Sequence, residues 1–130
     1  MLELLLTLLG VTPQQGWMSQ YAPDVMRYTV KARVYDLEHL TREQVMTADV
    51  YVAVVDCSRI GEMGWISING APYEIYLVAD CRGRNVTERW FEENNIIVEV
   101  DSRTAERHGV LGVGGVRVSM IPDHVRFSKN

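Results

Sequence analysis

An apolar strand ends in an acid and a thiol at Leu77-Val78-Ala79-Asp80-Cys81-Arg82-Gly83, where the chain turns into a loop. The apolar run 96–100 ends in a second acid, Asp101, and a last run, 116–120, follows the Gly-rich turn 112–115. Short apolar runs bounded by turn residues are typical of core strands. Two carboxylates at strand ends in one small β domain are therefore the sharpest functional signal in this sequence.

Further strands are predicted upstream of this centre. Asn69-Gly70 separates the alternating segments 65–68 and 73–78. This arrangement predicts a hairpin, because both turn residues tolerate a positive φ. The β-branched run 50–55 predicts a core strand that ends at Asp56 and Cys57.

The N-terminal third of the chain adds two more predicted strands. Residues 17–21 predict the first strand, stopped by Pro23. Apolar and polar residues alternate over 28–35, which predicts a strand with one solvated face.

The predicted helices are short. Thr41 and Gln44 have the spacing of a capping box, which predicts a helix near 40–46. Residues 87–91 predict at most one helical turn. Asp101 or Ser102 is predicted to cap a helix that runs to His108 and stops at Gly109.

Five motifs carry a resemblance to a known superfamily. They are G-W-M-S-Q-Y (16–21), G-W-I-S-I-N-G (64–70), Y-E-I-Y-L-V-A-D-C-R-G (73–83), N-N-I-I-V-E-V-D-S-R-T-A (94–105) and G-V-G-G-V-R-V (112–118). This series resembles the double-psi β-barrel of the rare lipoprotein A, barwin and expansin superfamily, while residues 24–50 match no part of it.

The resemblance implies an all-β fold, a six-stranded double-psi β-barrel over residues 16–121 with two or three short helical turns. Outside the barrel, residues 1–15 are predicted to form an apolar N-terminal segment and linker, with a short apolar helix, and residues 122–130 are predicted to form a polar tail. At 130 residues the chain has the length of one domain.

The resemblance also suggests catalytic candidates. Asp80 matches the strand-end acid that is the proposed proton donor in the lytic transglycosylase relatives. The family's Ala-Ala-His motif is replaced here by Val55-Asp56-Cys57-Ser58, so its histidine is missing. Asp56 and Asp80 would suit an inverting glycoside hydrolase if their carboxyls stand roughly 6.5 to 9.5 Å apart. The alternative for Asp80 is a loop carboxylate that accepts backbone hydrogen bonds.

Aromatic residues are the candidates for substrate binding. Tyr21, Trp65 and Trp90, with Trp17, could stack on the apolar face of a sugar, although aromatic residues in a small barrel also serve as core. Asp101 matches the family's Asp-x-Ser motif and is a further substrate-binding candidate, with helix capping as the alternative.

Composition excludes several function classes. The net charge of −4 and the pI near 5.3 argue against broad binding to nucleic acid or an anionic membrane. Two cysteines without a Cys-x-x-Cys motif make a metal site unexpected, and no cofactor is predicted. If their strands are neighbours, Cys57 and Cys81 can form a disulfide; the alternative is two buried thiols.

The N-terminal run 1–10 is too short to span a bilayer, which takes about 20 apolar residues. It lacks the basic start of a signal peptide, so a signal remnant and a docking helix remain alternatives. Leu2, Leu5, Leu6 and Leu9 fall on one helical face, which favours docking of residues 1–12 on a protein partner or a second copy.

Two function classes follow. The first is an extracytoplasmic, secreted or virion-associated module that binds cell-wall polysaccharide or peptidoglycan, or serves as a structural component of an assembly. The second is a glycan-cleaving enzyme, a lytic transglycosylase or an inverting hydrolase, with Asp80 as general acid. The missing histidine and the apolar N-terminal segment favour the first.

Overall fold

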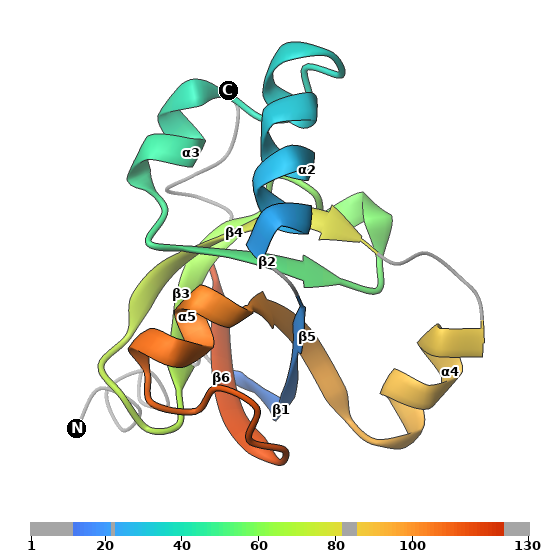
Figure 1. Ribbon diagram of the computed structural model, residues 1–130, viewed down its shortest axis with the longest axis vertical. Coiled ribbons are helices and arrows are strands. Elements are labelled where there is room, and N and C mark those ends of the chain that lie inside the picture. The colour runs from blue at the N-terminus through green and yellow to red at the C-terminus, as the bar shows by residue number, and fades with distance from the viewer. Residues whose placement is uncertain (1–11, 22, 82–85, 124–130) are drawn as a thin grey trace.

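The computed structural model describes residues 12–21, 23–81 and 86–123, which form a closed six-stranded barrel with helices around it (Figure 1). The strands are β1 (Gln14–Tyr21), β2 (Val50–Val54), β3 (Met63–Ile68), β4 (Glu74–Cys81), β5 (Ile96–Asp101) and β6 (Val116–Pro122). They pair in the order β1-β5-β2-β4-β3-β6. The predicted all-β barrel of six strands is confirmed.

The barrel contains two parallel pairs, β1 with β5 and β2 with β4, and all its other pairs are antiparallel. Exchanging β1, β2 and β3 for β4, β5 and β6 leaves both the strand order and the strand directions unchanged. The barrel therefore consists of two topologically equivalent halves, residues 14–68 and 74–122.

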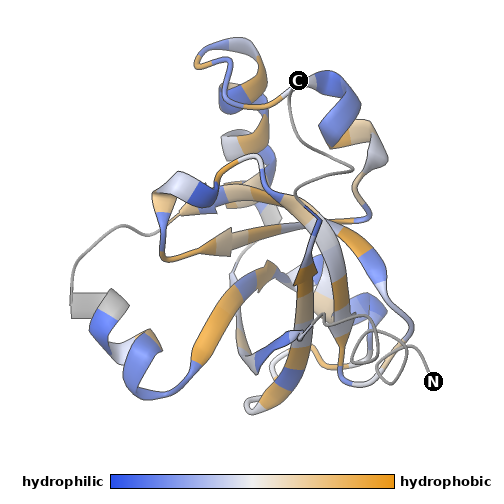
Figure 2. Ribbon diagram, turned by 180° about the vertical axis from the view of Figure 1, so that it is seen from behind, coloured by the Kyte–Doolittle hydropathy of each residue, from blue (hydrophilic) through white to orange (hydrophobic). Residues whose placement is uncertain are grey.

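Apolar side chains fill the barrel because one face of each strand points inward. The fully buried members include Val52, Ile66, Ile68, Tyr76, Val78, Val100 and Met120. Figure 2 shows the hydrophobic colour concentrated on the strands, while the helices carry much of the hydrophilic colour. The predicted hairpin joins β3 to β4, and Asn69 and Gly70 have the expected positive φ values of 54° and 75°.

The strand predicted over 28–35 is wrong, because these residues belong to helix α2 (Pro23–Tyr35). Met26, Val30 and Val34 recur every four residues, so the apolar residues fit a helical stripe as well as an alternating strand. Met26 and Val30 pack on Leu77 and Ala79 of β4. Burial against the barrel thus outweighs the strand preference of the β-branched and aromatic residues in this segment.

The other helices follow the prediction more closely. Helix α3 (Arg42–Thr47) starts with the predicted capping box of Thr41 and Gln44. Helix α4 (Val86–Glu93) is longer than the single turn expected there. Asp101 caps α5 (Ser102–Arg107), and Gly109 follows its end with φ 71°. A short 3-10 helix, η1 (Cys57–Arg59), follows β2.

The predicted docking helix of residues 1–12 lies almost wholly outside the described residues, as does most of the tail 122–130. The first strand begins at Gln14, two residues before the predicted domain boundary. Within the described ranges no helix has the length and apolar character needed to cross a membrane.

Candidate functional site

The parallel pairing of β2 and β4 brings the two predicted acid-and-thiol strand ends together. Val54 lies opposite Cys81 in the register. Cys57, in η1 just beyond β2, is bonded to Cys81, and their Cα atoms are 4.9 Å apart. The disulfide is confirmed, and it ties the loop after β2 to the end of β4.

A cleft of about 670 Å³ opens beside this disulfide. The ends of β2 and η1 form one side, and α4 with the start of β5 forms the other. The lining residues are Gln14, Val55, Asp56, Cys57, Arg59, Phe91, Glu92, Asn95, Ile96 and Ile97. The cleft thus combines apolar surface with amides, carboxylates and a guanidinium.

Arg59 is held in place from the barrel side of the cleft. Its Nε and Nη2 donate to Glu62 at 3.1 and 2.6 Å. The Tyr76 hydroxyl, from a fully buried residue, donates to the same carboxylate at 2.6 Å. Although burial opposes it, the hydrogen bond and charge of Glu62 raise the pKa of Arg59. The two hydrogen bonds to Glu62 do not use Nη1, and Arg59 lines the cleft.

Three further polar side chains of the cleft come from the facing wall and from β1. Glu92 lies on α4, Asn95 precedes β5 and Gln14 begins β1. Asn95 has φ 53°, a conformation that asparagine tolerates better than most residues. No described residue hydrogen-bonds to these three side chains. They therefore present donors and acceptors to the cleft.

Asp56 lies in this cleft, and it also caps η1. One of its oxygens accepts from the Ser58 backbone N–H at 2.9 Å and from the Ser58 hydroxyl at 2.7 Å. Its local role is thus structural, while its position at the cleft keeps it near any ligand bound there.

Asp80 lies elsewhere, under α2, and is absent from the lining of this cleft. Arg33 of α2 donates to it at 3.2 Å, and the side chains of Arg33 and Asp80 are only 14% and 31% exposed. The same guanidinium contacts His39 at 2.9 Å. To act as a general acid, Asp80 would have to leave its contact with Arg33.

Tyr21 belongs to the same layer beneath α2. It lies opposite Asp101 in the register of β1 and β5. Burial raises the pKa of the Tyr21 hydroxyl, and the charges of Asp101, Glu99 and Asp80 add to the effect. Its oxygen is buried without a hydrogen-bond partner among the described residues. Tyr21 is therefore placed as a covered residue rather than as an open stacking surface.

The remaining aromatic candidates lie on separate elements. Trp65, on β3, lies opposite Ile75 and Ile121. Trp17 lies under the guanidinium of Arg117, which is 5.3 Å from the ring centroid. Trp90 is 53% exposed and contacts Phe91 edge to face, with ring centroids 5.4 Å apart. Among the predicted aromatic residues, Trp90 is thus the one that contacts a residue of the cleft, Phe91.

Asp101 acts as the predicted helix cap, because it accepts from the Thr104 backbone N–H at 2.7 Å. It also lines a second groove, of about 480 Å³, between α2, β2 and α5. Asp56 and Asp101 hold the same position in the two halves of the barrel. Each caps the helix that follows the second strand of its half.

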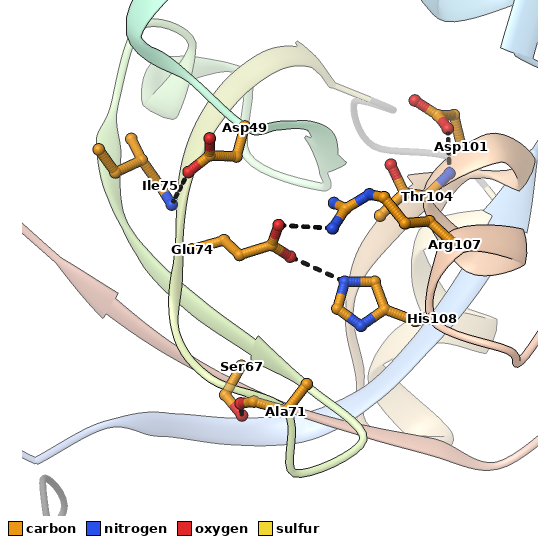
Figure 3. Close-up of polar contacts among 9 residues, drawn as sticks. All are labelled: Asp49, Ser67, Ala71, Glu74, Ile75, Asp101, Thr104, Arg107 and His108. Atoms are coloured by element: carbon orange, nitrogen blue, oxygen red, sulfur yellow. Dashed lines mark hydrogen bonds and ion pairs between the residues drawn. The ribbon is translucent and has the colours of Figure 1, made fainter.

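An ion-pair cluster that sequence patterns did not indicate lies beside this second groove (Figure 3). Glu74 of β4 accepts from Arg107 at 2.7 Å and pairs with His108, also at 2.7 Å. Burial alone would raise the pKa of Glu74, but the hydrogen bonds and charges of Arg107 and His108 lower it overall. The cluster joins the hairpin strand β4 to α5.

The cleft residues that sequence analysis missed include Gln14, Arg59, Phe91, Glu92 and Asn95. They come from four segments that meet only because β1 pairs with β5 and β5 pairs with β2. The Asn94-Asn95 pair ahead of a strand is the one local sequence signal for a cleft residue, because asparagine favours turns and Asn95 has a positive φ.

No cluster of three or more potential metal-ligating side chains occurs in the part of the chain that the structure describes. No family model, curated protein or solved structure matches this chain.

Proposed function

We propose that this protein is an extracytoplasmic double-psi β-barrel that binds a cell-wall or other structural polysaccharide without cleaving it. The cleft between η1 and α4 is the proposed glycan site. A structural role in an extracellular or virion assembly belongs to the same non-catalytic class.

The double-psi type of barrel is supported by the equivalence of the two halves. Each half is a strand, a helical connection, a second strand, a short helix and a third strand. The parallel pair β1–β5 of the barrel corresponds to the parallel pair β4–β2 when the two halves are compared. The motifs that resemble the superfamily lie on β1, β3, β4, β5 and β6.

The observation that carries the proposed function is the chemistry of the cleft. Sugars combine hydroxyl groups with apolar ring faces, and planar amides, carboxylates and guanidinium groups hydrogen-bond to neighbouring hydroxyls. Uncommitted groups on Gln14, Arg59, Glu92 and Asn95 surround apolar surface from Ile96, Ile97 and Phe91. Trp90 adds an exposed ring one residue before Phe91.

The extracytoplasmic location is supported by the disulfide, because disulfides persist in oxidising compartments and are rare in reducing ones.

Co-sedimentation with insoluble polymers tests the proposed function. The full chain is mixed with purified peptidoglycan, cellulose or chitin, and the pelleted fraction is measured. We expect binding to at least one polymer, and we expect Glu92→Gln to weaken it roughly tenfold, since a charged hydrogen bond is lost. Glu93→Gln, one residue further along α4, is the matched control and should bind as the wild type does.

Failure to pellet with any polymer would contradict the glycan site and leave the structural assembly role as the remaining non-catalytic function. Equal loss in Glu92→Gln and Glu93→Gln would also contradict it, because only Glu92 lines the cleft.

A glycan-cleaving enzyme is the second candidate. The observation in its favour is that two carboxylates, Asp56 and Glu92, line one cleft, as an acid–base pair would. Asp80, the general acid that the resemblance implies, lies outside this cleft and would have to release Arg33 to act. Release of anhydro-sugar ends would indicate transglycosylation, and release of reducing ends would indicate hydrolysis. Asp80→Asn should abolish either product if Asp80 is the acid.

A further inference from the structure

The second groove is the counterpart of the glycan cleft in the other half of the barrel. The first cleft lies between the helix after β2, the start of β5 and α4. The second lies between the helix after β5, the start of β2 and α2. When the two halves of the barrel are compared, β2 corresponds to β5, η1 corresponds to α5, and α4 corresponds to α2. One architecture thus forms two hollows with different side chains.

Three arginines and two aspartates line the second groove. Arg27 comes from α2, and Arg103 and Arg107 come from α5. Arg107 donates to Glu74, but no described residue pairs with the guanidinium of Arg27 or Arg103. The two uncommitted guanidiniums therefore stand on opposite walls. Met26 and Val30 of α2 also line the groove, with 2% and 8% of their surface exposed.

The acids of the groove are already engaged as hydrogen-bond acceptors. Asp49 accepts from the Ile75 backbone N–H at 2.9 Å, and Asp101 accepts from the Thr104 backbone N–H at 2.7 Å. The hydroxyl of Tyr51 donates to the Val45 carbonyl at 2.7 Å. The two backbone hydrogen bonds hold the carboxylates of Asp49 and Asp101 in place. Arg27 and Arg103 make no side-chain hydrogen bond or ion pair with a described residue.

We propose that this groove is a second binding site, which takes an oxyanion carried on a compact apolar body. The forks of Arg27 and Arg103 would hold the oxyanion, because a planar guanidinium makes paired hydrogen bonds to phosphate or carboxylate oxygens. The apolar body would cover Met26 and Val30. The proposal does not depend on glycan binding in the first cleft.

Chemical-shift mapping on the full ¹⁵N-labelled chain tests this proposal. Phenyl phosphate and benzoate are the two oxyanion probes, and benzyl alcohol is the neutral probe of similar size. We expect at least one oxyanion probe to shift the amides of α2 and α5 saturably at millimolar concentrations, and the alcohol to have no such effect. Binding of only one oxyanion probe assigns the site to phosphate or to carboxylate.

Substitutions of the two arginines test whether the oxyanion probe binds in this groove. Arg27→Gln and Arg103→Gln should each weaken the oxyanion probe roughly tenfold, since each removes one charge-assisted contact. Both residues are exposed, so the fold should be kept. Lys31→Gln, also on α2 but outside this groove, is the matched control and should bind as the wild type does.

Three results would each overturn the proposal. The first is that neither oxyanion probe shifts these amides. The second is that benzyl alcohol binds as tightly as the oxyanions. The third is that both arginine variants lose less than about threefold in affinity, which is smaller than a charged hydrogen bond contributes. None of these results bears on co-sedimentation through Glu92, so the two sites are tested separately.

Discussion

Glu74 shows how one side chain connects distant parts of the barrel. It lies at the start of β4 and contacts Arg107, the last residue of α5, and His108, which caps that helix. Its side chain is 19% exposed, so the contacts are partly shielded from water. The hairpin and the helix after β5 are thus held together by a charge that depends on pH.

Glu74→Gln should make stability less sensitive to acid. The folded protein lowers the pKa of Glu74 below the ordinary value of 4.5, so the ionised form stabilises the fold. This stabilisation is complete above that pH and is lost as the pH falls through the lowered pKa. Urea unfolding of the wild type should therefore weaken below about pH 4.5 more steeply than that of the variant.

Glu106→Gln is the control for this measurement, because Glu106 is an exposed acid on α5 whose side chain makes no hydrogen bond or ion pair with the described residues. Parallel pH curves for the wild type and Glu74→Gln would show that the cluster contributes nothing to acid stability.

Arg59 connects the interior to the proposed glycan site. Tyr76 fills the barrel with its ring and reaches Glu62 with its hydroxyl, and Glu62 in turn fixes two nitrogens of Arg59. Because two of its donors are held, Arg59 loses little conformational freedom when a ligand binds its remaining nitrogen. Core packing thereby orients a group in the cleft.

The Cys57–Cys81 disulfide is the element-scale link between the two halves of the barrel. It joins η1 to the end of β4 and closes a separation of 24 residues. On the chain-entropy estimate such a loop is worth about 3 kcal/mol, a large part of the stability of a small domain.

Reduction, or the double change Cys57→Ser with Cys81→Ser, should therefore lower the melting temperature. Thiol labelling of the untreated protein should find no free thiol. Two labelled thiols per chain, or an unchanged melting temperature after reduction, would count against this role.

Strands were easier to predict from this sequence than helices. The runs 50–54 and 96–100 are mostly apolar and β-branched, and 116–120 alternates Val116 and Val118 with polar residues, so local pattern and tertiary burial agree. In α2 they conflict, because Val30 and Val34 fit a spacing of two as well as a spacing of four. The segment is a helix because it packs on Leu77 and Ala79, which are some 50 residues away in sequence.

The candidate site was predicted only in part. Asp56, Cys57 and Cys81 follow from strand ends and were placed together by the parallel pairing of β2 and β4. Arg33 reaches Asp80 from a helix that was predicted as a strand, so their ion pair had no local signal. Glu92 and Gln14 are ordinary surface residues in sequence and gain their place in the cleft from the barrel order.

At the scale of the molecule, two equivalent halves carry different surfaces. The first cleft offers amides, carboxylates and one guanidinium, and the second is lined by three arginines, two aspartates and the apolar Met26 and Val30. The shared topology explains why both hollows occur, while the side chains decide what each can bind.

Residues 1–12 are predicted to act in assembly rather than in folding. Deleting them should leave the melting temperature close to that of the full chain, since the barrel begins at Gln14. The apolar face of Leu2, Leu5, Leu6 and Leu9 would be lost, so the elution volume in size-exclusion chromatography should shift toward a smaller species. An elution volume that changes only by the mass removed would show that the segment does not assemble the protein.

The position of the glycan site is tested most directly by chemical-shift mapping with a soluble fragment of whichever polymer the protein sediments with. Saturable shifts should cluster on the backbone amides of Asp56, Arg59, Glu92 and Asn95, which line the cleft beside the disulfide. Amides of α3, on the other side of α2, should stay in place. Shifts confined to α2 and α3, or spread evenly over the barrel, would contradict a glycan site between η1 and α4.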